Sequence, residues 1–87
     1  MFDEFLGRKV VLDLRSPFVC IGILKRIESD FLELRGADLH DLRDSDTNRE
    51  NYVAAACTAG INTNRKRVVI ARSEVVAISA VEDVVNE

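Results

Sequence analysis

Alternation of apolar and polar side chains at every second position constrains the first third of this 87-residue chain. Between residues 8 and 15, Val10, Leu12 and Leu14 fall on one side of an extended backbone. Successive side chains of a strand point to opposite faces, so this spacing predicts a half-buried β-strand. The pair Ser16-Pro17 ends the strand, because proline fixes φ and has no N–H to donate to a neighbouring strand. The chain therefore begins as a β-sheet protein.

Four further strands are predicted from the same alternation or from runs of β-branched residues. They cover residues 18–27, 31–39, 67–72 and 75–81. Gly22 and Gly36 interrupt the first two of these segments. A lone glycine inside a strand often marks a bulge or a tight bend. We therefore expect a sheet that curls on itself, as in a small barrel.

One α-helix is predicted at about residues 47–60. Thr47 and Glu50 have the spacing of a capping box, in which each side chain satisfies the other residue's backbone amide. Gly60 is expected to end the helix as a left-handed cap. One apolar stripe then runs along the helix, formed by Tyr52, Val53, Ala56 and Cys57.

A single helical turn is predicted at the start of the chain. Phe2, Phe5 and Leu6 would lie on one side of this turn, and Gly7 would end it. We expect the three apolar side chains to plug one end of a small core.

Composition excludes several classes of protein. Charged residues make up 31% of the chain, and no apolar stretch approaches the roughly 20 residues of a membrane span. The acidic residues Asp3 and Glu4 stand where a signal peptide would be basic, so we expect a cytoplasmic protein with both cysteines reduced. Two cysteines and one histidine are too few for a zinc site, and no glycine-rich phosphate loop or catalytic constellation is present. We therefore expect no enzymatic activity, no metal and no cofactor.

Charge is unevenly distributed along the sequence. The basic residues Arg65, Lys66, Arg67 and Arg72 give residues 62–72 a formal charge of +4, and residues 73–87 contain only acidic charges. A basic cluster is a candidate contact for a phosphate backbone. The alternative is a strand end whose charges are merely solvated.

The predicted order of elements resembles the Sm-like family, which includes the bacterial Hfq-type proteins. The resemblance rests on three segments: residues 6–12, 20–24 and 69–78. It covers roughly residues 5–39 and 66–81. It implies one domain over residues 1–87, a mainly β, SH3-like or Sm-like barrel made from a bent five-stranded sheet. A short helical turn would precede the sheet, and the helix at about 47–60 would be inserted between strands three and four.

The same resemblance implies single-stranded RNA as a ligand. The residues expected to bind it are Arg65, Lys66, Arg67, Arg72, Phe31 and Asp30. Two departures from the family pattern bear on this site: leucine (Leu32 or Leu34) replaces the base-binding asparagine, and Ser73 replaces a glycine. Because an apolar side chain cannot hydrogen-bond a base edge, we expect no uridine pocket of the family's usual kind.

The two closing strands are short, apolar and free of charge in their central parts, which is typical of edges that pair with another chain. We expect a closed homo-oligomeric ring, of six or seven subunits by resemblance, in which these strands pair head to tail. The predicted interface residues are Val68, Val69, Ile70, Val75, Val76 and Ile78. A homo-oligomeric scaffold that binds no nucleic acid, and that uses the inserted helix as a partner surface, is the alternative.

Overall fold

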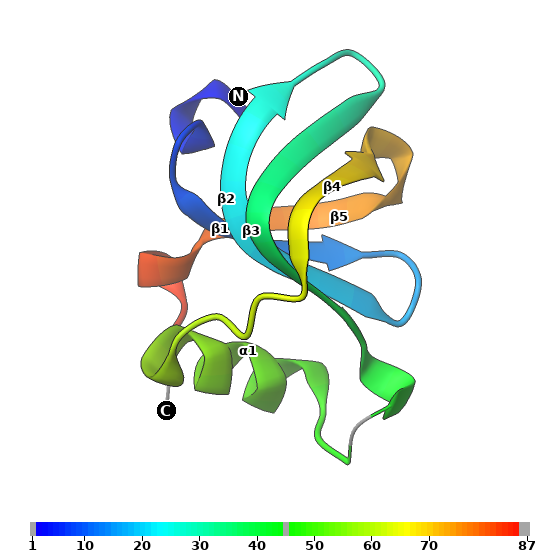
Figure 1. The fold of residues 1–87 in the computed structure, drawn as a ribbon. Helices are drawn as coiled ribbons and strands as arrows, with labels where there is room; N and C mark the ends of the chain where they lie inside the picture. Colours follow the sequence, from blue (N-terminus) through cyan, green and yellow to red (C-terminus); the bar gives the residue numbers. More distant parts are fainter. Residues whose placement is uncertain (1, 45, 86–87) are drawn as a thin grey trace.

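Five antiparallel strands form one strongly bent sheet in the order β4-β3-β2-β1-β5 (Figure 1). This computed structural model describes residues 2–44 and 46–85. The strands are β1 (Lys9–Leu14), β2 (Phe18–Ile27), β3 (Phe31–Asp41), β4 (Arg65–Ala71) and β5 (Val75–Ala80). The single α-helix of the described residues, α1 (Arg49–Ala59), lies between β3 and β4, and short 3-10 helices cover 2–5, 42–44, 72–74 and 81–83. The predicted mainly β architecture, with an initial helical turn and an inserted helix, is confirmed.

The sheet bends where the two strand glycines meet. Ile21 pairs with Asp38 and Ile23 with Arg35, so Gly22 stands opposite two residues of β3 rather than one. One of these two is Gly36, whose φ of 54° a side chain would disfavour. The backbones also approach closely, because a Cβ atom on Gly22 would lie 2.9 Å from that of Ala37. The bend predicted from the glycines is therefore present.

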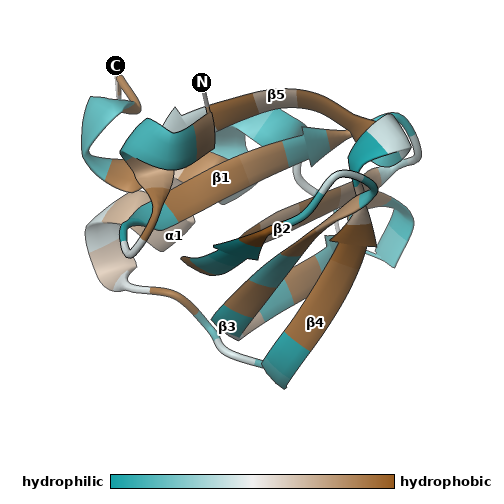
Figure 2. Ribbon diagram, turned by 90° about the horizontal axis from the view of Figure 1, so that it is seen from above, coloured by the Kyte–Doolittle hydropathy of each residue, from teal (hydrophilic) through white to brown (hydrophobic). Residues whose placement is uncertain are grey.

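The two faces of the bent sheet bury separate apolar clusters. The inner cluster fills the curl of the sheet and contains Val10, Leu12, Leu14, Cys20, Leu24, Leu32, Leu34, Ala37 and Ile70. The outer cluster lies between the sheet and α1 and contains Val11, Val19, Ile21 and Val53. Alternate residues of β1 thus belong to different clusters, and its ribbon is hydrophobic along much of its length (Figure 2). The apolar stripe predicted for the helix does face the sheet.

The outer face of the sheet has two halves. We call the part beneath α1 the helix-covered half; it consists of the outer cluster with Asp38 and His40. We call the remainder the arginine half; it consists of Glu33 with Arg26, Arg35 and Arg67. Nothing but side chains covers the arginine half among the residues described, whereas α1 spans the other half (Figure 1).

Three local predictions are corrected by the structure. Asn48, not Thr47, caps the helix, because its side-chain oxygen accepts a hydrogen bond from the Asn51 N–H at 2.8 Å. Gly60 does have a positive φ of 98°, but its ψ of 160° places it outside the left-handed helical region. At the N-terminal turn, Phe2 and Phe5 pack on the inner cluster whereas Leu6 is 52% exposed and does not join the plug.

The segment between β3 and β4 is closed by one side chain. The Asn64 side chain accepts from the Leu39 N–H at 3.0 Å and donates to the Leu39 carbonyl oxygen at 3.1 Å. The Asn64 N–H also donates to the Ala37 carbonyl oxygen at 2.9 Å. The segment that carries α1 therefore leaves and rejoins the sheet at neighbouring positions.

Candidate nucleic-acid interface and strand edges

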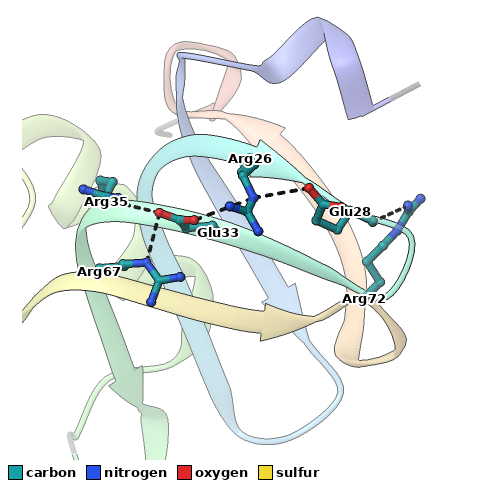
Figure 3. A network of polar contacts seen from close by, with 6 residues as sticks. All are labelled: Arg26, Glu28, Glu33, Arg35, Arg67 and Arg72. Carbon is teal, nitrogen blue, oxygen red and sulfur yellow. Dashed lines mark hydrogen bonds and ion pairs between the residues drawn. The ribbon is translucent and has the colours of Figure 1, made fainter.

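Three of the six predicted RNA-binding residues meet at one end of the sheet. Asp30 and Phe31 lie where the β2–β3 turn enters β3, and Arg72 lies in the turn between β4 and β5. The Arg72 N–H donates to the Asp30 carbonyl oxygen, and its Nη1 donates to the Glu28 carbonyl oxygen, both at 2.9 Å. These bonds fix the β4–β5 turn on the β2–β3 turn (Figure 3). We call this end of the sheet the turn end.

Two arginines at the turn end lie over aromatic rings. The Arg72 guanidinium carbon is 4.7 Å from the centre of the Phe2 ring, and that of Arg26 is 5.7 Å from the centre of the Phe31 ring. Such pairs gain cation–π attraction. Guanidinium planes and aromatic rings are also the groups on which single-stranded bases stack. The turn end therefore has the chemistry of a nucleobase platform, and the contribution of Arg26 and Phe2 was not predicted from the sequence.

The other predicted basic residues lie elsewhere. Arg65 pairs with Ala37 and Ala71 pairs with Phe31, so the start of β4 is six residues from the turn end along the strand. At about 3.3 Å per residue this separation is about 20 Å. Arg65 and Lys66 are exposed at the far end of β4. The basic cluster of the sequence is therefore not one patch.

Arg67 belongs instead to an ionic network centred on a buried carboxylate. Glu33 is only 4% exposed, and its carboxylate lies 2.7 Å from Arg35 Nε, 3.1 Å from Arg67 Nε and 4.0 Å from Arg26 Nε (Figure 3). The hydrogen bond from Arg35, followed by that from Arg67, lowers the pKa of Glu33 below its ordinary value. The carboxylate therefore stays ionised and holds side chains from three neighbouring strands together.

Sequence reasoning missed this network because its members come from three different strands. Glu33 alone reads as a solvent-facing residue of an alternating strand. Its one local signal is Arg35, which stands two positions later and therefore on the same face of β3.

A second buried carboxylate joins the helix to the sheet. Asp38 is 2% exposed; Tyr52 of α1 donates its hydroxyl hydrogen to Oδ2, and Asn64 donates from Nδ2 to Oδ1 at 3.2 Å. The Tyr52 ring stacks on that of His40 with the ring centres 3.9 Å apart. Burial, and then the bond to Asp38, raise the pKa of Tyr52 above its ordinary value. The tyrosine is therefore a neutral donor that anchors α1.

The six predicted interface residues lie on the two edge strands, because β4 and β5 end the sheet order. Val69 of β4 is 42% exposed and Val76 of β5 is 66% exposed. The other four are partly or wholly buried against the inner cluster: Val68, Ile70, Val75 and Ile78. Each edge strand thus presents one exposed valine.

The thiols are placed in unreactive surroundings. Cys20 lies in the inner cluster and Cys57 packs against the outer cluster, so the sheet separates them. Burial raises the pKa of Cys20 to about 12 and also raises that of Cys57. Both are therefore protonated at neutral pH and poor nucleophiles.

Two further searches of residues 2–44 and 46–85 gave negative results. No group of three or more histidine, cysteine, aspartate or glutamate side chains is placed to hold a metal ion. The helices in this part of the chain are too short or too polar to span a membrane.

Solved structures share this fold, although no family model and no curated protein sequence matches the chain. The Sm protein of Pyrococcus abyssii, solved in complex with a uridine heptamer, is 18% identical with a TM-score of 0.61 over 91% of this chain and 90% of its own. A chain of the NatC complex, solved bound to Gag peptide and CoA, is 15% identical with a TM-score of 0.55, over 90% of this chain and 87% of its own. At these identities the likeness is one of fold. The Sm-like fold expected from the sequence is confirmed.

Proposed function

We propose that this protein, which has the Sm-like fold, assembles into a closed ring of its own copies and binds single-stranded RNA at the turn end. The observation that supports RNA binding best is the pair of arginine–aromatic contacts there, Arg72 with Phe2 and Arg26 with Phe31. The complex of the Pyrococcus abyssii Sm protein with a uridine heptamer shows that this fold can present RNA-binding groups.

Each proposed contact has a distinct chemical role. The half-buried Phe31 ring offers a face for a base, and the exposed guanidinium of Arg26 attracts a phosphate. The exposed carboxylate of Asp30 accepts a hydrogen bond from a base edge. Arg72 holds the two turns together, so it acts both as a contact and as a brace. The role is binding without catalysis.

Fluorescence anisotropy with labelled oligouridine and oligoadenine tests the proposal. Affinity is expected to fall steeply between about 50 and 200 mM salt, because phosphate contacts release counterions. Phe31→Ala removes one stacking platform and is expected to weaken binding by about 1–3 kcal/mol.

Arg43→Ala is the control for charge, since Arg43 is exposed, pairs with Asp41 and lies beyond the opposite end of β3. It is expected to leave the affinity nearly unchanged. Absence of salt-sensitive binding even at low salt would contradict RNA binding.

Ring assembly is supported by the edge strands. Val69 and Val76 are exposed on strands whose outer backbone groups have no partner strand in the described chain. Exposed apolar edges favour pairing with another chain. Pairing of β4 with the β5 of the next copy is head-to-tail, so it either closes into a ring or extends into a fibre.

A ring that serves only as a protein scaffold is the second candidate. It is favoured by the same exposed valines and by the likeness to a chain of the NatC complex, a fold neighbour found in a protein assembly. An assembly that binds no RNA at low salt would favour the scaffold. A mass of 9.7 kDa by light scattering at micromolar concentration would exclude both ring proposals.

A further inference from the structure

The two edge strands carry charges of opposite sign at corresponding positions. β4 begins with Arg65, Lys66 and Arg67, and its ribbon changes from hydrophilic to hydrophobic along its length (Figure 2). β5 begins with apolar residues and is followed by Glu82 and Asp83, both exposed in the 3-10 helix that ends the sheet. One edge is therefore basic at its start and the other acidic just beyond its end.

The exposed valines select the direction in which these edges fit. Placing Val69 opposite Val76 in an antiparallel pair buries both side chains against each other and sets Arg65 opposite Ala80. Glu82 then lies on the diagonal from Arg65, a separation of about 7–8 Å between backbones that long side chains bridge.

The parallel alternative brings like charges together. With Val69 again opposite Val76, a parallel pair sets Arg65 opposite Arg72. Like charges directly opposite each other on paired strands are destabilising. Antiparallel pairing is therefore the arrangement in which apolar contact and charge agree.

The contacts within one copy leave these charges available. Glu82 forms an ion pair with Arg8, yet its side chain remains 71% exposed. Arg67 is engaged by Glu33, which leaves Arg65 and Lys66 as the exposed basic residues of the edge. Arg65 donates only to the neighbouring Asn64 carbonyl oxygen at 3.2 Å among the bonds of the described chain.

We propose that Arg65 and Lys66 of one copy lie against Glu82 and Asp83 of the next, so that charge complementarity selects a second copy of this chain, in antiparallel register, as the partner of the β4 edge. This inference rests on the ring assembly proposed above and specifies its interface. It also assigns Arg65 and Lys66 to assembly rather than to RNA.

Charge reversal on either edge tests the inference by size-exclusion chromatography with light scattering. Arg65→Glu with Lys66→Glu makes both edges acidic, and Glu82→Lys with Asp83→Lys makes both basic. Each double variant is expected to weaken self-association by about tenfold or more. Combining all four substitutions in one chain is expected to restore assembly, because the charges are then exchanged rather than matched.

Mixing the two double variants supplies a second test. Each variant's β4 edge then complements only the other's acidic or basic end, so assembly is expected in the mixture although neither variant assembles alone. Closed rings in the mixture contain the two chains in alternation and hence an even number of subunits.

Matched controls separate this inference from the ring proposal. Lys25→Glu with Arg43→Glu makes the same change in net charge at exposed residues away from both edges and is expected to leave assembly intact. Far-UV circular dichroism checks that every variant is folded. If the wild type assembles and the charge reversals do not weaken it, the charge inference is wrong and the ring stands. A wild type that is monomeric at every concentration overturns the ring and this inference together.

Discussion

The helix-covered half and the arginine half of the outer face are held together by different chemistry. Apolar packing of Val53 on Val11, Val19 and Ile21 dominates beneath α1, with one buried carboxylate bonded to a neutral phenol. In the arginine half a buried carboxylate is bonded to guanidinium groups that are each more than half exposed. One sheet thus uses a buried acid in two ways, as an anchor for a helix and as a bridge among strands.

The comparison teaches how each half should respond to perturbation. Packing losses cannot be compensated by solvent, whereas exposed guanidinium groups that lose a partner are solvated again. We therefore expect the helix-covered half to dominate stability at neutral pH, and the two halves to limit stability at opposite ends of the pH scale.

The largest difference is expected between two valines. Val53→Ala removes two buried methyl groups from the outer cluster and is expected to lower the free energy of unfolding by about 2 kcal/mol. Val69→Ala, on the exposed edge beside the arginine half, is expected to cost less than about 0.5 kcal/mol in the separated chain. Urea denaturation measures both, and equal losses would show that the halves do not differ in this way.

A smaller effect, confined to acid, is expected for the arginine half. The pKa of Glu33 is lower in the folded chain than its ordinary value of 4.5. Its contribution to stability is therefore present above that value and is lost as the pH falls below it. Glu33→Gln is expected to flatten the acid side of the stability curve, whereas Glu28→Gln, an exposed partner of Arg26, is expected to leave the curve unchanged.

The helix-covered half should limit stability in alkali. The folded pKa of Tyr52 is raised above its ordinary value of 10.0, so the unfolded chain ionises first and stability falls as the pH rises above about 10. Tyr52 is the only tyrosine and no tryptophan is present, so tyrosinate absorbance reports this group directly. Tyr52→Phe is expected to remove this alkaline loss and to cost about 1 kcal/mol at neutral pH. A midpoint of ionisation near 10 in the folded protein would argue against the buried bond.

The smallest effect sharpens the start of α1. Asn48→Ala removes the helix cap and is expected to cost about 0.5–1 kcal/mol. Thr47→Ala serves as its neighbour control and is expected to change stability by less. The reverse order in thermal unfolding would restore Thr47 as the cap.

The sequence predicted the fold wherever local patterns were strong. Both ends of β2 were predicted correctly, because Pro17 precedes it and the Glu28-Ser29-Asp30 turn follows it. β4 begins two residues earlier than predicted, at Arg65, because charged residues on an edge strand show no apolar alternation. Thr47 and Asn48 are both good caps, and only the backbone path decides between them.

The candidate site was predicted less completely. Asp30, Phe31 and Arg72 were identified and lie together, whereas their partners Phe2 and Arg26 come from other parts of the chain. Arg65 and Lys66 follow one another closely in sequence with Arg72, but an extended strand carries neighbours in sequence far apart in space. A cluster of charge in a sequence therefore indicates a patch only after the strand direction is known.

The closure of the α1 segment by Asn64 makes that segment a module. Because its ends are joined through Leu39 and Ala37, residues can be added between them without moving either strand. The entropy of closing a flexible loop rises by only about 0.6 kcal/mol for each doubling of its length. Evolution is therefore free to lengthen, shorten or exchange this segment, provided that whatever replaces α1 still shields Val11, Val19 and Ile21 from water.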